Sequence, residues 1–407
     1  MRVLVHLNSL ELGGTQINAV DFAAAAREHG VESVLVGDRT TVPEGPSLLD
    51  IAHRRGLDVE QYVPRDSVLG RGKQLTEMAE RHRVDLVHVY GSWGGAARPT
   101  YWGYARFGRR PWLQTVYEME VSPKVKRHMP LIVGTGYLIE ELRDRPAPTV
   151  LISPPVDTAA DRPDPVAAAG FRAKYDLEGL LVVIVSRLDA SMKSLPVSIA
   201  IEAMRELADD CTLVIVGTGD DAERLHALGA DVNRSVERDA VRFVGPLSDP
   251  RSAYAAADVM LGMGGSAARS LAFGAPLVVQ GEAGWSQLFE PATAEALMRH
   301  SYWSAESVPD PVTRLTSILR RVLADADLRG RLGGRGRDFA EERFSLDAMT
   351  RQLVDFYRAS VAVRGLLGWA ADLPPELAVL GRKVARGGRR RVRPSAVPMV
   401  RTGMSAP

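Results

Sequence analysis

The segment LVVIVSRL (residues 181–188) indicates the fold class, because five apolar residues in a row lead into a polar turn that begins at Ser186. An uninterrupted apolar run rich in Val and Ile is typical of a parallel strand that helices cover on both faces. Lys193 follows in the next loop, before a helical pattern over 197–207. The segment therefore predicts a strand whose carboxyl end carries two cations, Arg187 and Lys193.

Similar patterns extend in both directions from this segment. A Pro- and Asp-rich break at 154–165 separates two series of apolar runs that alternate with amphipathic stretches. We therefore predict an α/β protein with two doubly wound, Rossmann-like domains, 1–155 and 156–343, that face a cleft. Ligands of such sheets bind outside the carboxyl ends of the strands. Strands are expected at 3–7, 33–36, 85–89, 112–116, 131–133 and 149–152, and then at 181–185, 213–216, 241–243, 259–261 and 276–279.

Composition and charge exclude several classes of protein. The chain has 407 residues, 45% of them apolar and 25% charged, with a net charge of +1, so a sizeable core is available and nucleic acid is not an expected partner. A single cysteine cannot form an internal disulfide, and the first apolar stretch is too short for a signal peptide. We expect a cytoplasmic protein. The eight histidines are scattered, so no metal site is predicted.

The end of the chain, residues 363–407, reads as a basic, flexible tail. Such a cluster is usually solvated and disordered, but it could also be attracted to an anionic membrane surface at the inner face of the membrane. Apolar residues that could lie at such an interface precede it. The cations are Arg382, Lys383, Arg386, Arg389, Arg390, Arg391 and Arg393, and the apolar residues are Leu366, Leu367, Trp369, Leu373, Leu377, Val379 and Leu380.

Three glycine-rich turns each join a predicted strand to a predicted helix. Such a turn lets the backbone approach a phosphate, and the helix N-terminus adds partial positive charge. In the third turn, Ser266 is a predicted N-cap. Each turn is also common as an ordinary tight turn. The turns are Gly13-Gly14-Thr15, Gly217-Thr218-Gly219 and Gly264-Gly265-Ser266.

In their order along residues 1–360, these motifs resemble the GT-B glycosyltransferases, in particular the large retaining family 4 group. Ser186-Arg187-Leu188 with Lys193 is similar to the Arg-Leu…Lys donor motif of that group. The other matching segments are 13–14, 85–88, 152–157, 214–219, 241–246, 257–259 and 272–276.

The resemblance implies an acceptor domain, then a nucleotide-sugar domain, and a helix at 344–362 that crosses back to the first. Arg187 and Lys193 would hold the donor diphosphate as the catalytic residues, and the Gly13 loop would close over it. Retaining members use front-face displacement, in which the departing phosphate deprotonates the acceptor. The residues implied or predicted to bind the nucleotide sugar are Gly13, Gly14, Thr15, Gly217, Thr218, Gly219, Val244, Gly264, Gly265, Ser266, Arg269 and Glu282.

The sequence also departs from the family pattern. Family members carry a pair of glutamates that contact sugar and ribose, but Arg269 stands at the second position and the first has no counterpart. Glu282 is therefore a candidate carboxylate, and a surface loop residue is the alternative. Tyr117 takes the place of a histidine that faces the donor sugar. Glu118 is a candidate acceptor residue, although a solvated loop is the alternative. His88 matches another family histidine, and a structural role is its alternative.

The predicted function is sugar transfer from a nucleoside-diphosphate donor, a UDP- or GDP-sugar, to a hydroxyl acceptor, with no cofactor. The acceptor would be a glycan, a lipid-linked molecule or a small molecule. High Ala, Arg and Gly content suggests a GC-rich bacterial genome, as in actinomycetes. The alternatives are a catalytically degenerate nucleotide-sugar-binding protein and a nucleotide-sugar epimerase.

Overall fold

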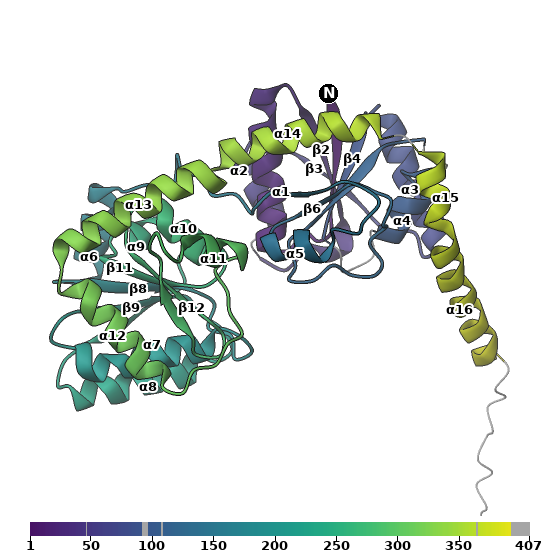
Figure 1. Ribbon diagram of the computed structural model, residues 1–407. Coiled ribbons are helices and arrows are strands. Elements are labelled where there is room, and N and C mark those ends of the chain that lie inside the picture. The colour runs from purple at the N-terminus through teal and green to yellow at the C-terminus, as the bar shows by residue number, and fades with distance from the viewer. Residues whose placement is uncertain (46, 92–96, 107–108, 364, 392–407) are drawn as a thin grey trace, which may run out of the picture.

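The computed structural model shows two α/β halves side by side, each built on one sheet flanked by helices (Figure 1). A long helical stretch spans both halves, and two further helices follow at the C-terminal end. The structure describes residues 1–45, 47–91, 97–106, 109–363 and 365–391, with the backbone alone from residue 383 onward.

The first sheet has seven parallel strands in the order β3-β2-β1-β4-β5-β6-β7. Strand order reverses between β1 and β4, so a crevice for ligands is expected beside their carboxyl ends. Strands β4 (Leu86–Tyr90) and β5 (Trp112–Val116) are buried along their whole length, because helices cover both faces. The other elements are β1 (Arg2–Leu7), α1 (Gly14–Ala25), η1 (Ala26–His29), β2 (Glu32–Asp38), η2 (Arg39–Thr41), α2 (Leu48–Arg54), β3 (Val59–Tyr62), α3 (Val68–Arg81), α4 (Ala97–Trp102), β6 (Leu131–Val133), α5 (Gly136–Glu141) and β7 (Thr149–Leu151).

The second sheet has six strands in the order β10-β9-β8-β11-β12-β13, with β13 antiparallel at the edge. Its switch point lies between β8 (Leu181–Val185) and β11 (Val259–Gly262). The two doubly wound domains predicted from the alternating pattern are confirmed. The other elements are α6 (Pro165–Tyr175), α7 (Ser194–Leu207), β9 (Thr212–Val216), α8 (Ala222–Ser235), β10 (Val241–Gly245), α9 (Arg251–Ala255), α10 (Gly265–Ala272), β12 (Leu277–Gln280), β13 (Ser286–Leu288), α11 (Ala294–Arg299), α12 (Pro311–Leu323) and α13 (Ala326–Phe344).

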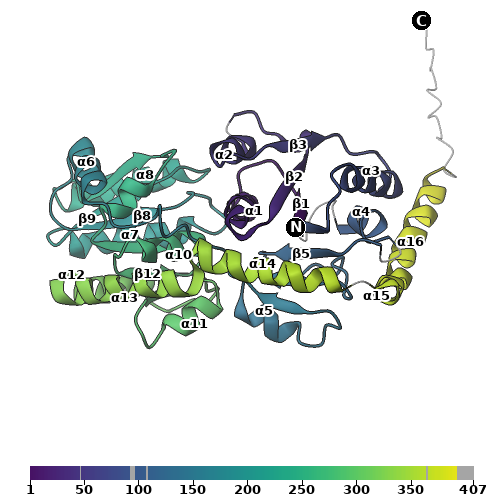
Figure 2. The same ribbon diagram turned by 90° about the horizontal axis from the view of Figure 1, so that it is seen from above.

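The chain passes between the two halves twice, and the two crossings are hydrogen-bonded to each other. The Val156 N–H donates to the Phe344 carbonyl (2.9 Å), and the N–H of Leu346 donates to the Val156 carbonyl (2.7 Å). Helix α14 (Leu346–Ala362) then packs against α1, β4 and β5 of the first half. Figure 2 shows α13 and α14 in line along one side of both halves.

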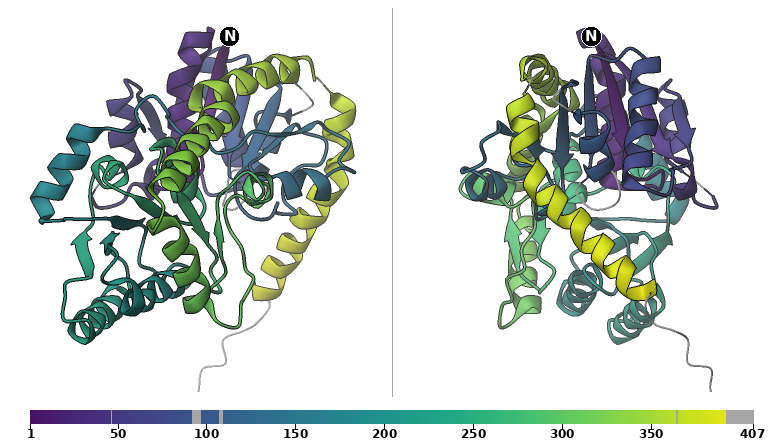
Figure 3. Two further views of the ribbon diagram at one scale, coloured as in Figure 1. Left: turned by 60° about the vertical axis from the view of Figure 1, so that its left-hand side comes forward. Right: turned by 90° about the vertical axis from the view of Figure 1, so that its right-hand side faces the viewer.

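The end of the chain is helical where we expected a flexible tail. Helix α15 (Leu366–Ala371) and helix α16 (Leu373–Arg391) follow α14, and α15 lies against the first half (Figure 3). The expectation of flexibility is wrong for these helices, because the buried Trp369 stacks on Tyr101 of α4, a contact that local composition does not reveal. Residues 392–407, with the cation Arg393, lie outside the described residues.

Candidate active site

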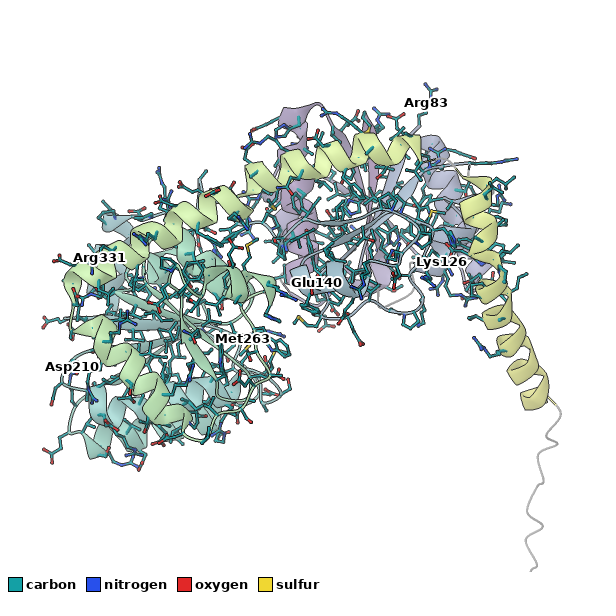
Figure 4. All side chains as sticks on the ribbon, in the orientation of Figure 1. Arg83, Lys126, Glu140, Asp210, Met263 and Arg331 are labelled. Atoms are coloured by element: carbon teal, nitrogen blue, oxygen red, sulfur yellow. The ribbon has the colours of Figure 1, made fainter. Side chains whose placement is uncertain are left out.

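A small pocket lies at the carboxyl edge of the second sheet, where β8, β11 and β12 end and α7 and α10 begin. Its wall includes Ser186 after β8, Lys193 before α7, Ser266 in α10 and Gln280 at the end of β12. Met263 also lines it, and its label in Figure 4 marks this region of the second half. The pocket therefore occupies the crevice in which open parallel sheets bind ligands.

Lys193 is half-buried in the wall of this pocket, directly before α7. Its backbone N–H donates to the Asp189 carbonyl (3.2 Å), which fixes the turn after β8. Burial lowers the pKa of the Lys193 amine, and the carboxylates of Asp189 and Glu282 oppose this shift. The positive charge of Arg187 lowers the same pKa further. An anionic ligand would relieve this repulsion between the two cations.

Arg187 follows the pocket residue Ser186 in the chain, and 83% of its side chain is exposed. Its Nη2 lies 3.9 Å from Asp189 Oδ2, a loose pair of the kind that contributes little to stability in water. An exposed guanidinium is able to turn toward a phosphate and bind it through two parallel hydrogen bonds. The structure thus brings the two predicted cations onto one turn at the pocket.

The glycines of the Gly217-Thr218-Gly219 turn support the Arg187 turn. Gly217 has a φ of +145°, and a Cβ there would lie 1.8 Å from the Ser186 carbonyl oxygen. A Cβ on Gly219 would lie 2.3 Å from the carbonyl oxygen of Leu188. The Leu188 N–H donates to the Thr218 carbonyl (3.0 Å), so the two turns continue the pairing of β8 with β9. Close backbone approach is therefore sufficient to explain these glycines.

Helix α10 begins with Gly264 as its N-cap, at φ +60°, a conformation that favours glycine. The prediction that Ser266 is the N-cap is wrong, because Ser266 lies inside the helix and its Oγ donates to the Met263 carbonyl (3.1 Å). Gly265 has open space where a Cβ would stand. The turn still faces the pocket through Ser266.

Arg269 contacts the linker between the halves. Its Nε donates to Asp161 Oδ2 (2.7 Å) and its Nη2 to Asp161 Oδ1 (2.6 Å), and its guanidinium lies over the Tyr254 ring (5.4 Å to the centroid). Asp161 is 5% exposed. Burial raises the pKa of this carboxyl, and the hydrogen bonds from Arg269 oppose the shift. This bidentate pair gives Arg269 a structural role, in place of the predicted contact with the nucleotide.

Glu282 lies in the loop after β12, and its charge acts on Lys193. Its Oε2 accepts a hydrogen bond from Trp303 Nε1 (3.2 Å), and its N–H donates to the Ser304 carbonyl (3.0 Å). These contacts hold one carboxylate beside the pocket. The predicted Val244 lies in β10, where it is half-buried.

Residues 179–308, which contain β8 to β13 and the whole pocket, match the family described as Glycosyl transferases group 1. This part of the chain is similar to group 1 glycosyltransferases, and we refer to residues 179–308 as the group 1 domain.

Known proteins support this assignment. The chain is 28% identical over 236 residues to a GDP-mannose-dependent alpha-(1-6)-phosphatidylinositol monomannoside mannosyltransferase from two strains of Mycobacterium tuberculosis. The match covers 54% of this chain and 58% of that enzyme, so the chain spans little more than half the length of these curated relatives. Among solved structures, a glycosyltransferase from Rickettsia africae is similar (TM-score 0.70, 16% identity, 88% of this chain and 98% of that one). Anabaena HepE in complex with UDP is also similar (TM-score 0.67, 15% identity, 88% and 100%). This likeness shows the GT-B fold.

The group 1 domain meets the first half on the side of α5 and α11. Glu140, labelled in Figure 4, forms an ion pair with Arg299, and the ring of Tyr137 stacks on His300 with 6.0 Å between centroids. Arg55 of the first half also reaches Asp157 of the linker, at 3.5 Å.

The Gly13-Gly14-Thr15 turn lies at the carboxyl end of β1 in the first half. Gly13 is the N-cap of α1, with an extended φ of −150° and no side-chain capping bond. A Cβ on Gly14 would meet open space, whereas one on Gly13 would lie 2.4 Å from Gln16 Oε1. The first N–H groups of an uncapped helix attract anions, so the turn suits its predicted contact with phosphate.

The predicted acceptor-side residue His88 is packed inside the first half. It is 0% exposed in β4, and its ring nitrogens are each 2.7 Å from a hydroxyl, Nδ1 from Tyr357 and Nε2 from Thr115. Its ring also stacks on Tyr90 (4.1 Å between centroids). Burial holds the pKa of His88 far below its ordinary value. The prediction of an acceptor-side role is corrected, because α14 packs over β4 and its Tyr357 hydroxyl is hydrogen-bonded to the His88 ring.

Tyr117 and Glu118 begin the loop after β5, at the carboxyl edge of the first sheet, and both are half-buried. Tyr117 lies close to Gly134, since a Cβ on that glycine would be 2.7 Å from Tyr117 Cδ1. Burial raises the pKa of the Tyr117 hydroxyl, and Tyr357 adds to the shift. The position at this edge is compatible with the predicted contacts to sugar or acceptor.

Sequence reasoning missed Gln280 and Asp161. Gln280 is 4% exposed, and its Nε2 donates to the Pro196 carbonyl (3.0 Å), which ties β12 to α7 beside Lys193. A polar residue at the end of an apolar strand was the available signal. Asp161 gave no local signal, because its partner Arg269 lies 108 residues away. In the described part of the chain, no three His, Cys, Asp or Glu residues are placed to hold a metal ion, and no helix there is long and apolar enough to cross a membrane.

Proposed function

We propose that this chain transfers a sugar from a nucleoside diphosphate to a hydroxyl group of an acceptor. The observation that carries the proposal is the placement of Arg187 and Lys193 on one turn at the pocket of the group 1 domain. Fixed cations there would stabilise the charge that develops on a leaving diphosphate. The mycobacterial relatives depend on GDP-mannose and the HepE structure holds UDP, which supports a GDP- or UDP-sugar as donor.

In this reaction the bond from the anomeric carbon to the β-phosphate oxygen breaks, and a bond from the same carbon to the acceptor oxygen forms. The bonding electrons leave with the phosphate oxygen, and Arg187 and Lys193 would neutralise its new charge. The acceptor proton passes to the departing phosphate. Glu282, held by Trp303, would bind sugar hydroxyls in place of the family glutamate pair. The first-turn amides of α1 and α10, with the Gly217 turn and Val244, would line the donor site.

We further propose that the anomeric configuration is retained. The proposal rests on the resemblance to the retaining group and on front-face attack, which requires no carboxylate nucleophile. NMR of the product anomeric proton, compared with the donor, measures the outcome. An inverted product would exclude this mechanism.

The main test replaces both cations, Arg187→Ala with Lys193→Ala. We expect kcat to fall by at least about 100-fold, the effect of removing one charge-stabilising group. Affinity for UDP and GDP, measured by titration, should fall as well. The matched control is Arg234→Ala, which removes an exposed cation of the same domain that pairs with the exposed Asp231. Unchanged donor affinity and turnover in the double variant would refute the proposed role of these cations.

A catalytically degenerate nucleotide-sugar-binding protein is the second candidate, and Arg269 is the observation that favours it. Arg269 stands where the family that this chain resembles has a glutamate, and its guanidinium donates hydrogen bonds to both carboxylate oxygens of Asp161. Release of UDP or GDP from sugar nucleotides separates the two. Binding without release in any acceptor mixture would favour the degenerate protein.

We also propose that the acceptor is lipid-linked and that the chain contacts an anionic membrane through its C-terminal helices. The mycobacterial relatives act on a phosphatidylinositol mannoside, which supports a lipid acceptor. Leu366, Leu367 and Leu377 are 59%, 85% and 51% exposed and precede the basic part of α16. Trp369, which we had grouped with them, is buried instead and contributes to anchoring the helices.

A further inference from the structure

The C-terminal helices insert a buried carboxylate into the first half. Glu376 of α16 is 1% exposed. It accepts hydrogen bonds from Arg98 Nε (2.6 Å) and Trp102 Nε1 (3.0 Å) of α4, and from Lys126 Nζ (2.6 Å) in the loop after β5. Burial alone would raise the pKa of Glu376, but these donors hold it below its ordinary value. The carboxylate is therefore charged, and it joins two segments of the first half.

Two neighbouring residues extend this contact. The carboxylate of Asp372 is 3.2 Å from the backbone nitrogens of Arg127 and His128, whose N–H groups donate to it. The ring of Trp369 stacks on Tyr101 (5.4 Å between centroids, 7° between planes), and the Tyr101 hydroxyl donates to the Trp369 carbonyl (2.7 Å). We call residues 366–377, which carry these groups, the C-terminal brace.

The brace holds the segments that follow β4 and β5. Helix α4 comes after β4, and Lys126 lies in the loop 117–130 between β5 and β6, where its label in Figure 4 stands beside α16. The same loop begins with Tyr117 and Glu118. Helix α4 follows the carboxyl end of β4, and loop 117–130 starts at the carboxyl end of β5, the edge at which ligands of open sheets bind, before it returns to the amino end of β6. A long loop without helix or strand keeps one conformation only when other groups hold it.

We propose that Glu376 is a positioning residue for the acceptor site, which it shapes by holding loop 117–130 and α4 in place. The inference rests on the proposed glycosyl transfer, since only then does this edge receive an acceptor. Each cation that Glu376 binds is itself nearly buried, Arg98 at 9% and Lys126 at 7% exposed. Without the carboxylate these two cations would repel each other across the joint between loop and helix. The brace therefore links the end of the chain to the acceptor edge and leaves the donor pocket untouched.

The test compares Glu376→Gln with wild type in the full chain. The amide keeps the shape but turns an N–H toward one of the cations. Hydrogen exchange in residues 117–130 should become about tenfold faster, because local opening there loses its main restraint. Titration with UDP and GDP should give affinities within about twofold of wild type, since the pocket of the group 1 domain lies in the other half. With phosphatidylinositol monomannoside as the probe acceptor, the acceptor KM should rise while nucleotide release to water stays unchanged.

The matched control is Glu206→Gln, which removes an exposed carboxylate paired with Arg320 on the second half and should change none of these readouts. Trp102→Phe removes one donor to Glu376 and serves as the milder variant if Glu376→Gln does not fold; it should speed the same exchange to a smaller extent. Hydrogen exchange in 117–130 that is unchanged in Glu376→Gln would overturn the inference. A loss of nucleotide affinity as large as the loss of acceptor affinity would overturn it as well. Failure of the proposed glycosyl transfer gives a different result from failure of this inference. In the first case the wild-type protein releases no nucleotide with any acceptor, and hydrogen exchange in Glu376→Gln still tests whether the brace holds loop 117–130.

Discussion

At the residue scale, the ion pair with Asp161 changes the role expected for Arg269 from nucleotide binding to structural support. A guanidinium has only donors, so it cannot accept hydrogen bonds from ribose hydroxyls as a glutamate would. Arg269 instead binds both oxygens of Asp161, whose side chain is 7% exposed. The pair joins the linker to α10, and we expect nucleotide recognition to use other groups of the pocket.

We therefore predict that Arg269→Ala lowers the free energy of unfolding by about 1–3 kcal/mol, because it leaves a buried carboxylate without its partner. Affinity for UDP and GDP should change by less than about twofold, as expected for a residue without contact to the ligand. Urea denaturation and nucleotide titration measure the two effects. Arg234→Ala is the control, since its partner Asp231 is 54% exposed and its loss should cost within about 0.5 kcal/mol. A large loss of affinity for UDP or GDP with an unchanged free energy of unfolding would indicate that Arg269 binds the nucleotide.

At the scale of elements, the returning helix α14 is held to the first sheet by a buried polar contact. The Tyr357 hydroxyl of α14 bonds to His88 of β4, whose other nitrogen bonds to Thr115 of β5. Such a contact stabilises only while the imidazole is neutral, because burial excludes its charged form. The attachment of the helix is therefore sensitive to pH.

We predict that stability falls as the pH is lowered below about 6.5, the ordinary pKa of an unfolded histidine. The unfolded chain then binds a proton at His88 that the folded chain excludes, so the free energy of unfolding drops by up to about 1.4 kcal/mol per pH unit. Buried His6, whose pKa burial lowers to about 4, acts in the same direction. Urea denaturation between pH 7 and 5 measures the slope. His88→Gln should flatten it, whereas the exposed His53→Gln should not, and equal slopes in all three proteins would contradict the account.

At the scale of the whole molecule, positive charge is concentrated at one end. The net charge is +1, yet seven cations lie between residues 382 and 393 without an acidic residue among them. Helix α16 starts in the brace and runs out beyond the first half (Figure 1), so its basic part is carried on an anchored helix. An anchored basic helix would place the acceptor edge of the first half near an anionic surface.

We predict that the full chain sediments with vesicles that contain phosphatidylglycerol and much less with pure phosphatidylcholine. Removal of residues 383–407 leaves the brace intact but deletes six of the seven cations, at about 1 kcal/mol each near the surface. Binding should therefore weaken by at least about 100-fold, and high salt should weaken it in the full chain. The control removes only residues 394–407 and keeps the cluster. Equal partitioning of the two truncated forms would rule out this contact.

Local pattern predicted the inner strands of both sheets and the two cations after β8, but it missed the edge strands β3 and β13. The apolar run 181–185 specifies a buried strand, and the turn that follows must lie at its carboxyl end. The prediction reached as far as the turn that carries Arg187 and Lys193. It failed at the end of the chain, where the local composition of residues 363–391 is that of a tail.

Only the tertiary structure shows which partners the polar side chains of His88, Arg269 and Glu376 bind. Their partners Tyr357, Asp161 and Lys126 lie 269, 108 and 250 residues away in the chain. Periodicity reports which face of an element is buried, because burial follows from the residues of that element. The partner of a buried polar group depends on which distant surfaces meet, and only the packing of the whole chain specifies that.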